Sequence, residues 1–259
     1  MTKIIAVANQ KGGVGKTTST VNMAASLAVM KRKVLIVDMD PQGNATTGVG
    51  LDKHSPPVLL SDVLLGEARI EDALQTVPNT NISALAGGPD LTIAELEMMQ
   101  MDDREYRLHN ALQGIRENYD FVIVDCPPSL NMLTVNALVA ANGVLIPMQC
   151  EYYALEGLSA LMGSIETIRD NSNPKLEIMG LLRTMFDPRN NLAKDVSRQL
   201  SEYFGEKLYN TSIPRNIRLA EAPSHGLPVL LYDKRSHGAL AYLALAAEMI
   251  RKEAAREAA

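Results

Sequence analysis

The feature that most limits the fold of this chain is a glycine-rich run, Lys-Gly-Gly-Val-Gly-Lys-Thr-Thr, at residues 11–18. An apolar stretch typical of a buried strand precedes it (residues 4–8), and a stretch with helical spacing follows (residues 17–30). A strand, a glycine loop and a helix in this order form a phosphate-binding loop, in which backbone N–H groups and the positive helix end surround an anion. The alternative is a glycine turn without a ligand, and the order of the three elements disfavours it.

The side chains of the run have separate expected tasks. Glycine lets the backbone approach phosphate oxygens without a Cβ clash. Lys16 is expected to reach the β- and γ-phosphates, and the Thr17 hydroxyl to hold Mg²⁺. The expected nucleotide contacts are Lys11, Gly12, Gly13, Val14, Gly15, Lys16, Thr17 and Thr18.

The run carries one lysine more than usual. The ordinary pattern G-x-x-x-x-G-K-[ST] would place a glycine at position 10, where this chain has Gln10 followed by Lys11. Lys11 is too far along the chain to duplicate the role of Lys16 on the same phosphates. It could instead supply charge to a nucleotide held by a second subunit.

Length, cysteine content and hydropathy bound the class of protein. The chain has 259 residues and no Pro/Ser/Gly-rich linker, so we expect one domain over residues 1–259. Its two cysteines are too few for a disulfide framework. The first expected strand leaves no room for a signal peptide, and the apolar stretches are too short to span a bilayer. We therefore expect a cytoplasmic protein without a membrane partner.

The formal net charge of −5 argues against a generally basic nucleic-acid binder. The charge is nevertheless unevenly distributed, because residues 180–240 contain nine Lys/Arg and six Asp/Glu. This surplus allows a local basic face, although scattered solvated charges would explain it equally well.

Apolar runs alternate with helical patterns along the chain. This alternation predicts an α/β fold, a doubly wound, mostly parallel sheet with helices on both faces. Ligands of such sheets bind beyond the carboxyl ends of the strands. We expect strands at residues 3–9, 33–38, 81–85, 121–125, 143–148, 178–185 and 208–213, and helices at residues 17–30, 108–119, 130–141, 155–169, 192–204 and 239–255.

Carboxylates stand at the ends of two expected strands. One strand ends on Asp38, with Asp40 two residues later, and another ends on Asp125 before Cys126 and two prolines. Such an aspartate is usually only a turn or cap residue. Beside a phosphate loop, however, it can hold Mg²⁺ through water or position an attacking water.

The glycine loop and four later segments together resemble the ParA-type partition ATPases, P-loop NTPases with a deviant Walker A motif, and especially their short chromosomal forms. The later segments are residues 37–44, 123–129, 149–157 and 213–226. The resemblance implies a homodimer that encloses ATP and Mg²⁺, in which Lys11 reaches the partner's nucleotide.

The resemblance also implies roles for individual residues. Asp40 would orient the hydrolytic water, and Asp125 would support the metal and a switch loop. Pro214 and Asn216 match positions that frame the adenine. Arg189 and Arg218 match positions that contact DNA without regard to sequence, although Arg189 could equally be a solvated turn residue.

Together these features favour a nucleoid-associated ATPase switch with a ParB-type centromere-binding partner. One alternative is a membrane-cycling ATPase, which would need a C-terminal amphipathic helix, but residues 250–259 are Ala-rich. An iron–sulfur carrier is a second alternative, and the spacing of Cys126 and Cys150 does not suit it. A small-molecule enzyme of the dethiobiotin-synthetase type is a third, and it would not need Lys11.

Overall fold

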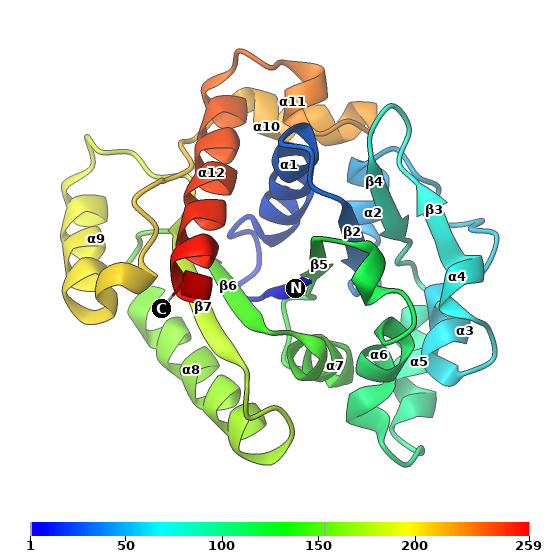
Figure 1. The fold of residues 1–259 in the computed structure, drawn as a ribbon. Coiled ribbons are helices and arrows are strands. Elements are labelled where there is room, and N and C mark those ends of the chain that lie inside the picture. The colour runs from blue at the N-terminus through cyan, green and yellow to red at the C-terminus, as the bar shows by residue number, and fades with distance from the viewer. Residues whose placement is uncertain (1, 153, 259) are drawn as a thin grey trace.

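The computed structural model describes residues 2–152 and 154–258. In this part of the chain a seven-stranded sheet has the order β3-β4-β2-β5-β1-β6-β7 (Figure 1). Its strands are parallel except for β3, which pairs antiparallel with β4 at one edge. The strands are β1 Lys3–Val7, β2 Val34–Asp38, β3 Leu74–Thr76, β4 Ile82–Leu85, β5 Phe121–Asp125, β6 Gly143–Met148 and β7 Glu177–Arg183.

The sheet is covered on both faces, which confirms the predicted doubly wound α/β fold. Successive side chains of a strand point to opposite faces. Thus Ile4 and Ala6 of β1 enter one core cluster, whereas Ile5 and Val7 enter the other. β2 and β5 are buried along their whole length, as expected for central parallel strands.

The helices divide between these two clusters (Figure 1). Helices α3 to α9 pack on one face, and α1, α2, α10, α11 and α12 on the other. No described helix is both long and apolar enough to cross a membrane. The helices are α1 Lys16–Val29, α2 Asn44–Gly48, α3 Leu60–Leu65, α4 Ile70–Ala73, α5 Leu91–Met98, α6 Arg107–Leu112, α7 Met132–Ala140, α8 Ala154–Asn171, α9 Asn191–Phe204, α10 Ile217–Glu221, α11 Val229–Tyr232 and α12 His237–Ala258.

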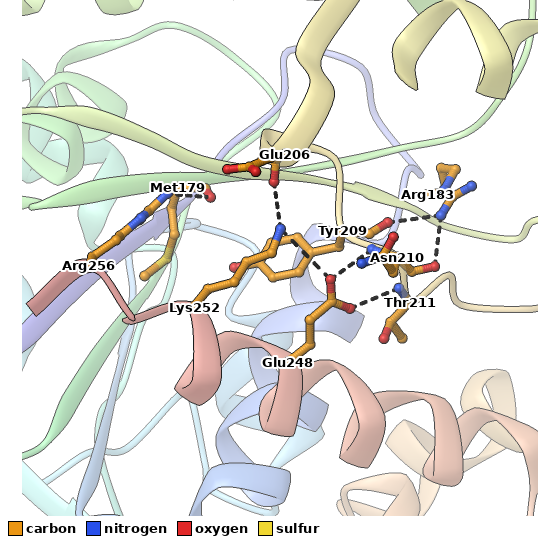
Figure 2. A network of polar contacts seen from close by, with 9 residues as sticks. All are labelled: Met179, Arg183, Glu206, Tyr209, Asn210, Thr211, Glu248, Lys252 and Arg256. Carbon is orange, nitrogen blue, oxygen red and sulfur yellow. Dashed lines mark hydrogen bonds and ion pairs between the residues drawn. The ribbon is translucent and has the colours of Figure 1, made fainter. Parts of the chain in front are cut away.

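The predicted strand at residues 208–213 is wrong. This segment follows β7, and Tyr209 N donates to Leu181 O, but the backbone N–H groups of Asn210 and Thr211 turn away to the Glu248 carboxylate of α12 (Figure 2). Those donors are therefore lost to strand pairing. Leu208 forms an isolated bridge with Leu181, and Ile213 N still donates to Arg183 O, but no continuous ladder results. β3 was not predicted, because three half-buried or exposed residues carry no apolar pattern.

The predicted helix at residues 108–119 is shorter in the structure. α6 ends at Leu112, and a separate 3-10 turn spans Arg116–Asn118. Gly114 lies between them, and glycine in a helix interior is unfavourable by about 1 kcal/mol relative to alanine. Several short helices (α2, α3, α4, α5, α10 and α11) were not predicted, since few turns leave little periodicity to detect.

Candidate nucleotide-binding site

The glycine loop joins the carboxyl end of β1 to the first turn of α1, where the sequence places it. Gly13 and Gly15 have φ values of 72° and 87°. Residues other than glycine rarely adopt this left-handed backbone conformation. Apart from the glycine and its chain neighbours, no atom of the described residues lies within 4 Å of the position that a Cβ would occupy at Gly12 or Gly13. These two glycines therefore leave open space beside the backbone, as a bound phosphate requires.

Lys16 is buried at the base of this loop. Its Nζ donates to the carbonyl oxygen of Lys11 at 3.3 Å. Burial lowers the pKa of Lys16, although the negative field of Asp125 opposes the shift. A buried ammonium of this kind is well suited to act as the counterion of a phosphate group.

Asp125 links the end of β5 to α1. Its carboxylate accepts hydrogen bonds from the hydroxyls of Thr17 at 2.7 Å and Thr20 at 2.9 Å. Burial and the negative charge of Asp38 raise the pKa of Asp125, and the two hydroxyls counter this. Because Thr17 donates its proton to Asp125, the lone pairs of its oxygen stay available to a metal. Hydroxyl and carboxylate oxygens are suitable partners for Mg²⁺.

Sequence reasoning missed Thr20. It follows Thr17 by three residues, so both lie on one face of the helix. That spacing was the available signal.

Asp38 and Asp40 occupy different environments. Asp38 is fully buried and accepts from the backbone N–H of Thr46 at 2.8 Å and from its hydroxyl at 2.7 Å. It therefore holds α2 against the end of β2. Asp40 accepts from the backbone N–H of Gln42 at 3.0 Å, and its field acts on Lys16. Of these two carboxylates, Asp40 is the one whose charge acts on Lys16, whereas Asp38 binds both donors of Thr46.

The Lys11 side chain contacts the segment that follows β6. Its Nζ lies 2.6 Å from the Glu151 carboxylate, and the two side chains are 44% and 48% exposed. Glu151, in the segment after β6, was not singled out from the sequence. Thr184 was also missed, and its hydroxyl supports the loop by donating to Val14 O at 2.7 Å.

Pro214 and Asn216 lie beside the end of β7. Pro214 forms a parallel bridge with Phe186, two residues beyond the Thr184 that supports the loop. The Oδ1 of Asn216 is buried and accepts no hydrogen bond from any described residue. This oxygen lies against Gly238 in the first turn of α12, 3.1 Å from the position that a Cβ would occupy there. An unsatisfied buried acceptor is costly.

Arg189 and Arg218 both lie on the surface, and each is paired with a nearby carboxylate. Arg189 is 89% exposed and contacts Asp187 through two hydrogen bonds, of 2.8 and 3.0 Å. Arg218 contacts Glu221 at 2.7 Å and Asp233 at 3.4 Å. The structure therefore gathers the loop, Lys16 and the aspartates into one site but leaves these two arginines outside it.

The chain is similar in sequence to several known proteins. A family model described as an AAA domain matches residues 2–178. The chain is 48% identical to the chromosome partitioning protein ParA of Caulobacter vibrioides, over 99% of this chain and 97% of that protein. It is 49% identical to the sporulation initiation inhibitor protein Soj of Bacillus subtilis, over 96% and 98% of the two chains.

Two solved structures are also similar. A cobyrinic acid a,c-diamide synthase from Mycobacterium smegmatis, bound to an ATP analogue and magnesium, has a TM-score of 0.85 and 35% identity, over 97% of this chain and 95% of that one. The cell division ATPase MinD of Pyrococcus furiosus has a TM-score of 0.79 and 27% identity, over 97% and 99%.

Proposed function

This chain belongs to the ParA/Soj family of partition ATPases, and we propose that it hydrolyses ATP with Mg²⁺ as a dimerising switch on DNA. ATP closes a homodimer, and the dimer binds DNA without regard to sequence, so that it resides on the nucleoid. A ParB-type centromere-binding partner then triggers hydrolysis and release. Hydrolysis is slow and acts as a timer.

The observation that carries this proposal is the different placement of the two loop lysines. Lys16 is buried inside the loop, where it serves the nucleotide of its own subunit. Lys11 extends outward to Glu151 and is half exposed, so it is available to a nucleotide in a second subunit. An ordinary phosphate loop needs only the lysine at the position of Lys16.

The remaining residues of the site divide the chemistry. Thr17 is the expected Mg²⁺ ligand, and Asp125 orients its hydroxyl. A bound Mg²⁺ neutralises charge on the β- and γ-phosphates. Asp40 orients the attacking water, and Pro214 and Asn216 frame the adenine. In this proposal residues 1–259 act as one ATPase domain.

Two other functions have a specific relative in their favour. The similarity to MinD supports a membrane-cycling ATPase. The similarity to the cobyrinic acid a,c-diamide synthase supports a small-molecule enzyme. Both relatives are less similar in sequence than the partitioning proteins at 48% and 49% identity, so we favour partition.

ATPase assays with and without plasmid DNA, and with a ParB-type partner, test the proposal. We expect DNA and partner together to stimulate hydrolysis, with Lys16→Ala as the inactive control. ATP-dependent flotation with liposomes would favour the membrane-cycling function instead. ATP consumption that depends on a corrinoid and is indifferent to DNA would favour the small-molecule enzyme.

A further inference from the structure

Helix α5 presents an unpartnered apolar face to solvent. Its inner face is buried against the core. On the outer face Ile93 is 60% exposed and Leu96 68%, and Met99, just past the helix, is 44% exposed. Single exposed apolar residues are ordinary on protein surfaces. Three at a spacing of three residues lie on one side of a helix and form a continuous strip.

The sequence around this strip is strongly acidic. Residues 90–105 contain one basic side chain, Arg104, and six carboxylates: Asp90, Glu95, Glu97, Asp102, Asp103 and Glu105. None of these carboxylates forms an ion pair with a residue in the described ranges 2–152 and 154–258. The Arg104 guanidinium donates to the carbonyl of Met99. The local net charge therefore equals the −5 of the entire chain.

This charge selects among possible occupants. Nucleic acids and anionic membranes are repelled by unpaired carboxylates. A second copy of the chain in a symmetric contact would place the same acidic surface against itself. A basic polypeptide with one apolar face is the occupant that satisfies both the strip and its charge.

We propose that α5 and residues 99–105 form a docking surface for a basic amphipathic helix of a partner protein. Apolar side chains of the incoming helix cover Ile93 and Leu96. Its lysines or arginines meet the carboxylates around them, including Glu97 and Asp102. Apolar anchors at such interfaces supply most of the affinity, and the charged rim supplies orientation and association rate.

The surface is connected to the loop that follows Asp125. The two carboxylate oxygens of Glu95 accept from the Asn131 side chain and from the backbone N–H of Met132, both at 3.0 Å. Asn131 in turn caps α7. A helix docked on α5 would therefore touch the element that holds the far end of this loop. The docking surface stands by itself, and only its effect on hydrolysis rests on the proposed function.

Fluorescence anisotropy with the full-length chain tests the docking surface. The probe is a labelled synthetic helix with leucines at i, i+3, i+4 and i+7 and lysines elsewhere. A peptide of the same composition in shuffled order is the control for charge alone. We expect the ordered peptide to bind more tightly, and the double variant I93S/L96S to weaken its binding by about tenfold, the loss typical of interface anchors. Glu97→Lys should also weaken binding of the ordered peptide.

Matched substitutions elsewhere provide the controls. Leu231→Ser removes another exposed apolar side chain, and Glu202→Lys reverses another exposed charge. Both should bind the peptide as the wild type does. Equal binding of the two peptides, or equal losses in the control variants, would overturn the proposal. Neutral phosphatidylcholine vesicles that bind the wild type but not I93S/L96S would overturn it in favour of a lipid contact.

ATP-dependent DNA binding of the same variants separates this inference from the proposed function. If the wild type binds the peptide through α5 but never binds DNA, the docking surface stands and the proposed function fails. If DNA binding is normal and α5 variants bind the peptide like the wild type, the docking surface fails alone.

Discussion

Two lysines of one loop, five residues apart, meet opposite surroundings. Lys16 is buried and its pKa is lowered by burial, whereas Lys11 is half exposed beside Glu151. An exposed ion pair of this kind contributes about 0–1 kcal/mol, so Lys11 can leave it readily. The ion pair thus engages the Lys11 side chain without fixing it in place.

Alanine substitutions should separate these roles. Lys16→Ala should abolish nucleotide binding, because the glycine backbone offers only neutral hydrogen bonds. Lys11→Ala should still bind ATP as a monomer but form no ATP-dependent dimer and hydrolyse none. Nucleotide titration and analytical ultracentrifugation measure the two effects. Normal ATP-dependent dimers of Lys11→Ala would refute the cross-subunit role.

Asp40 and Asp38 should also differ on substitution. Asp40→Ala should keep ATP binding, dimerisation and thermal stability but stop hydrolysis, because its carboxylate is assigned to the attacking water. Asp38→Ala should instead lower the melting temperature, since it leaves both Thr46 donors without their acceptor. Steady-state ATPase assays and thermal melts distinguish the variants. Wild-type turnover by Asp40→Ala would reduce Asp40 to a turn residue.

Among the elements, the C-terminal helix α12 organises a segment distant in sequence. Glu248 accepts from Asn210 N at 2.8 Å and Thr211 N at 2.9 Å, and Lys252 donates to Glu206 O (Figure 2). Burial would raise the pKa of Glu248, but the hydrogen bonds from Thr211 and Asn210 and the charge of Lys252 outweigh it and lower the pKa. The folded state therefore favours the ionised form of Glu248 more than the unfolded state does.

Glu248→Gln should lower the free energy of unfolding by about 2 kcal/mol at neutral pH, the usual range for hydrogen bonds to a buried charged group. A depressed folded-state pKa contributes stability above the unfolded value, and this contribution is lost as the pH falls through the folded value. The difference from wild type should therefore shrink below about pH 4. Urea denaturation at several pH values measures it, and Glu206→Gln, at an exposed carboxylate in the same segment, is the control.

At the scale of the whole molecule, a net charge of −5 coexists with the proposed DNA binding, so the contact must be local. Arg189 and Arg218 are each held by neighbouring carboxylates in the structure. Phosphate groups would have to replace those partners. DNA affinity should accordingly be sensitive to salt and indifferent to sequence.

Arg218→Ala should remove one phosphate contact from each subunit of the dimer. The slope of log K against log salt should then become shallower by roughly 2, at about 0.9 per contact. Arg189→Ala should have a similar, independent effect, and both variants should keep ATP-dependent dimers. Arg69→Ala is a matched control, because Arg69 is also exposed and paired with a carboxylate three residues away. An unchanged slope, or a loss confined to one duplex, would contradict the assignment.

The sequence by itself determined the doubly wound sheet and the position of the phosphate loop within it. Both follow from local patterns: apolar runs buried on both faces, and a glycine loop between a strand and a helix. The carboxylates at the ends of β2 and β5 were also predictable. Parallel strands bring their carboxyl ends to one edge, and the register pairs Asp38 with Asp125 directly.

Only the tertiary structure decided which groups distant in the sequence pair with one another. Thr20 on Asp125, Glu151 on Lys11 and Glu248 on residues 210–211 lie 105, 140 and about 38 positions from their partners in the chain. The apolar pattern of residues 208–213 reports only local preference, and for that reason it predicted a strand there. The carboxylate of α12 captures two of those backbone donors, and nothing within the segment itself records that competition.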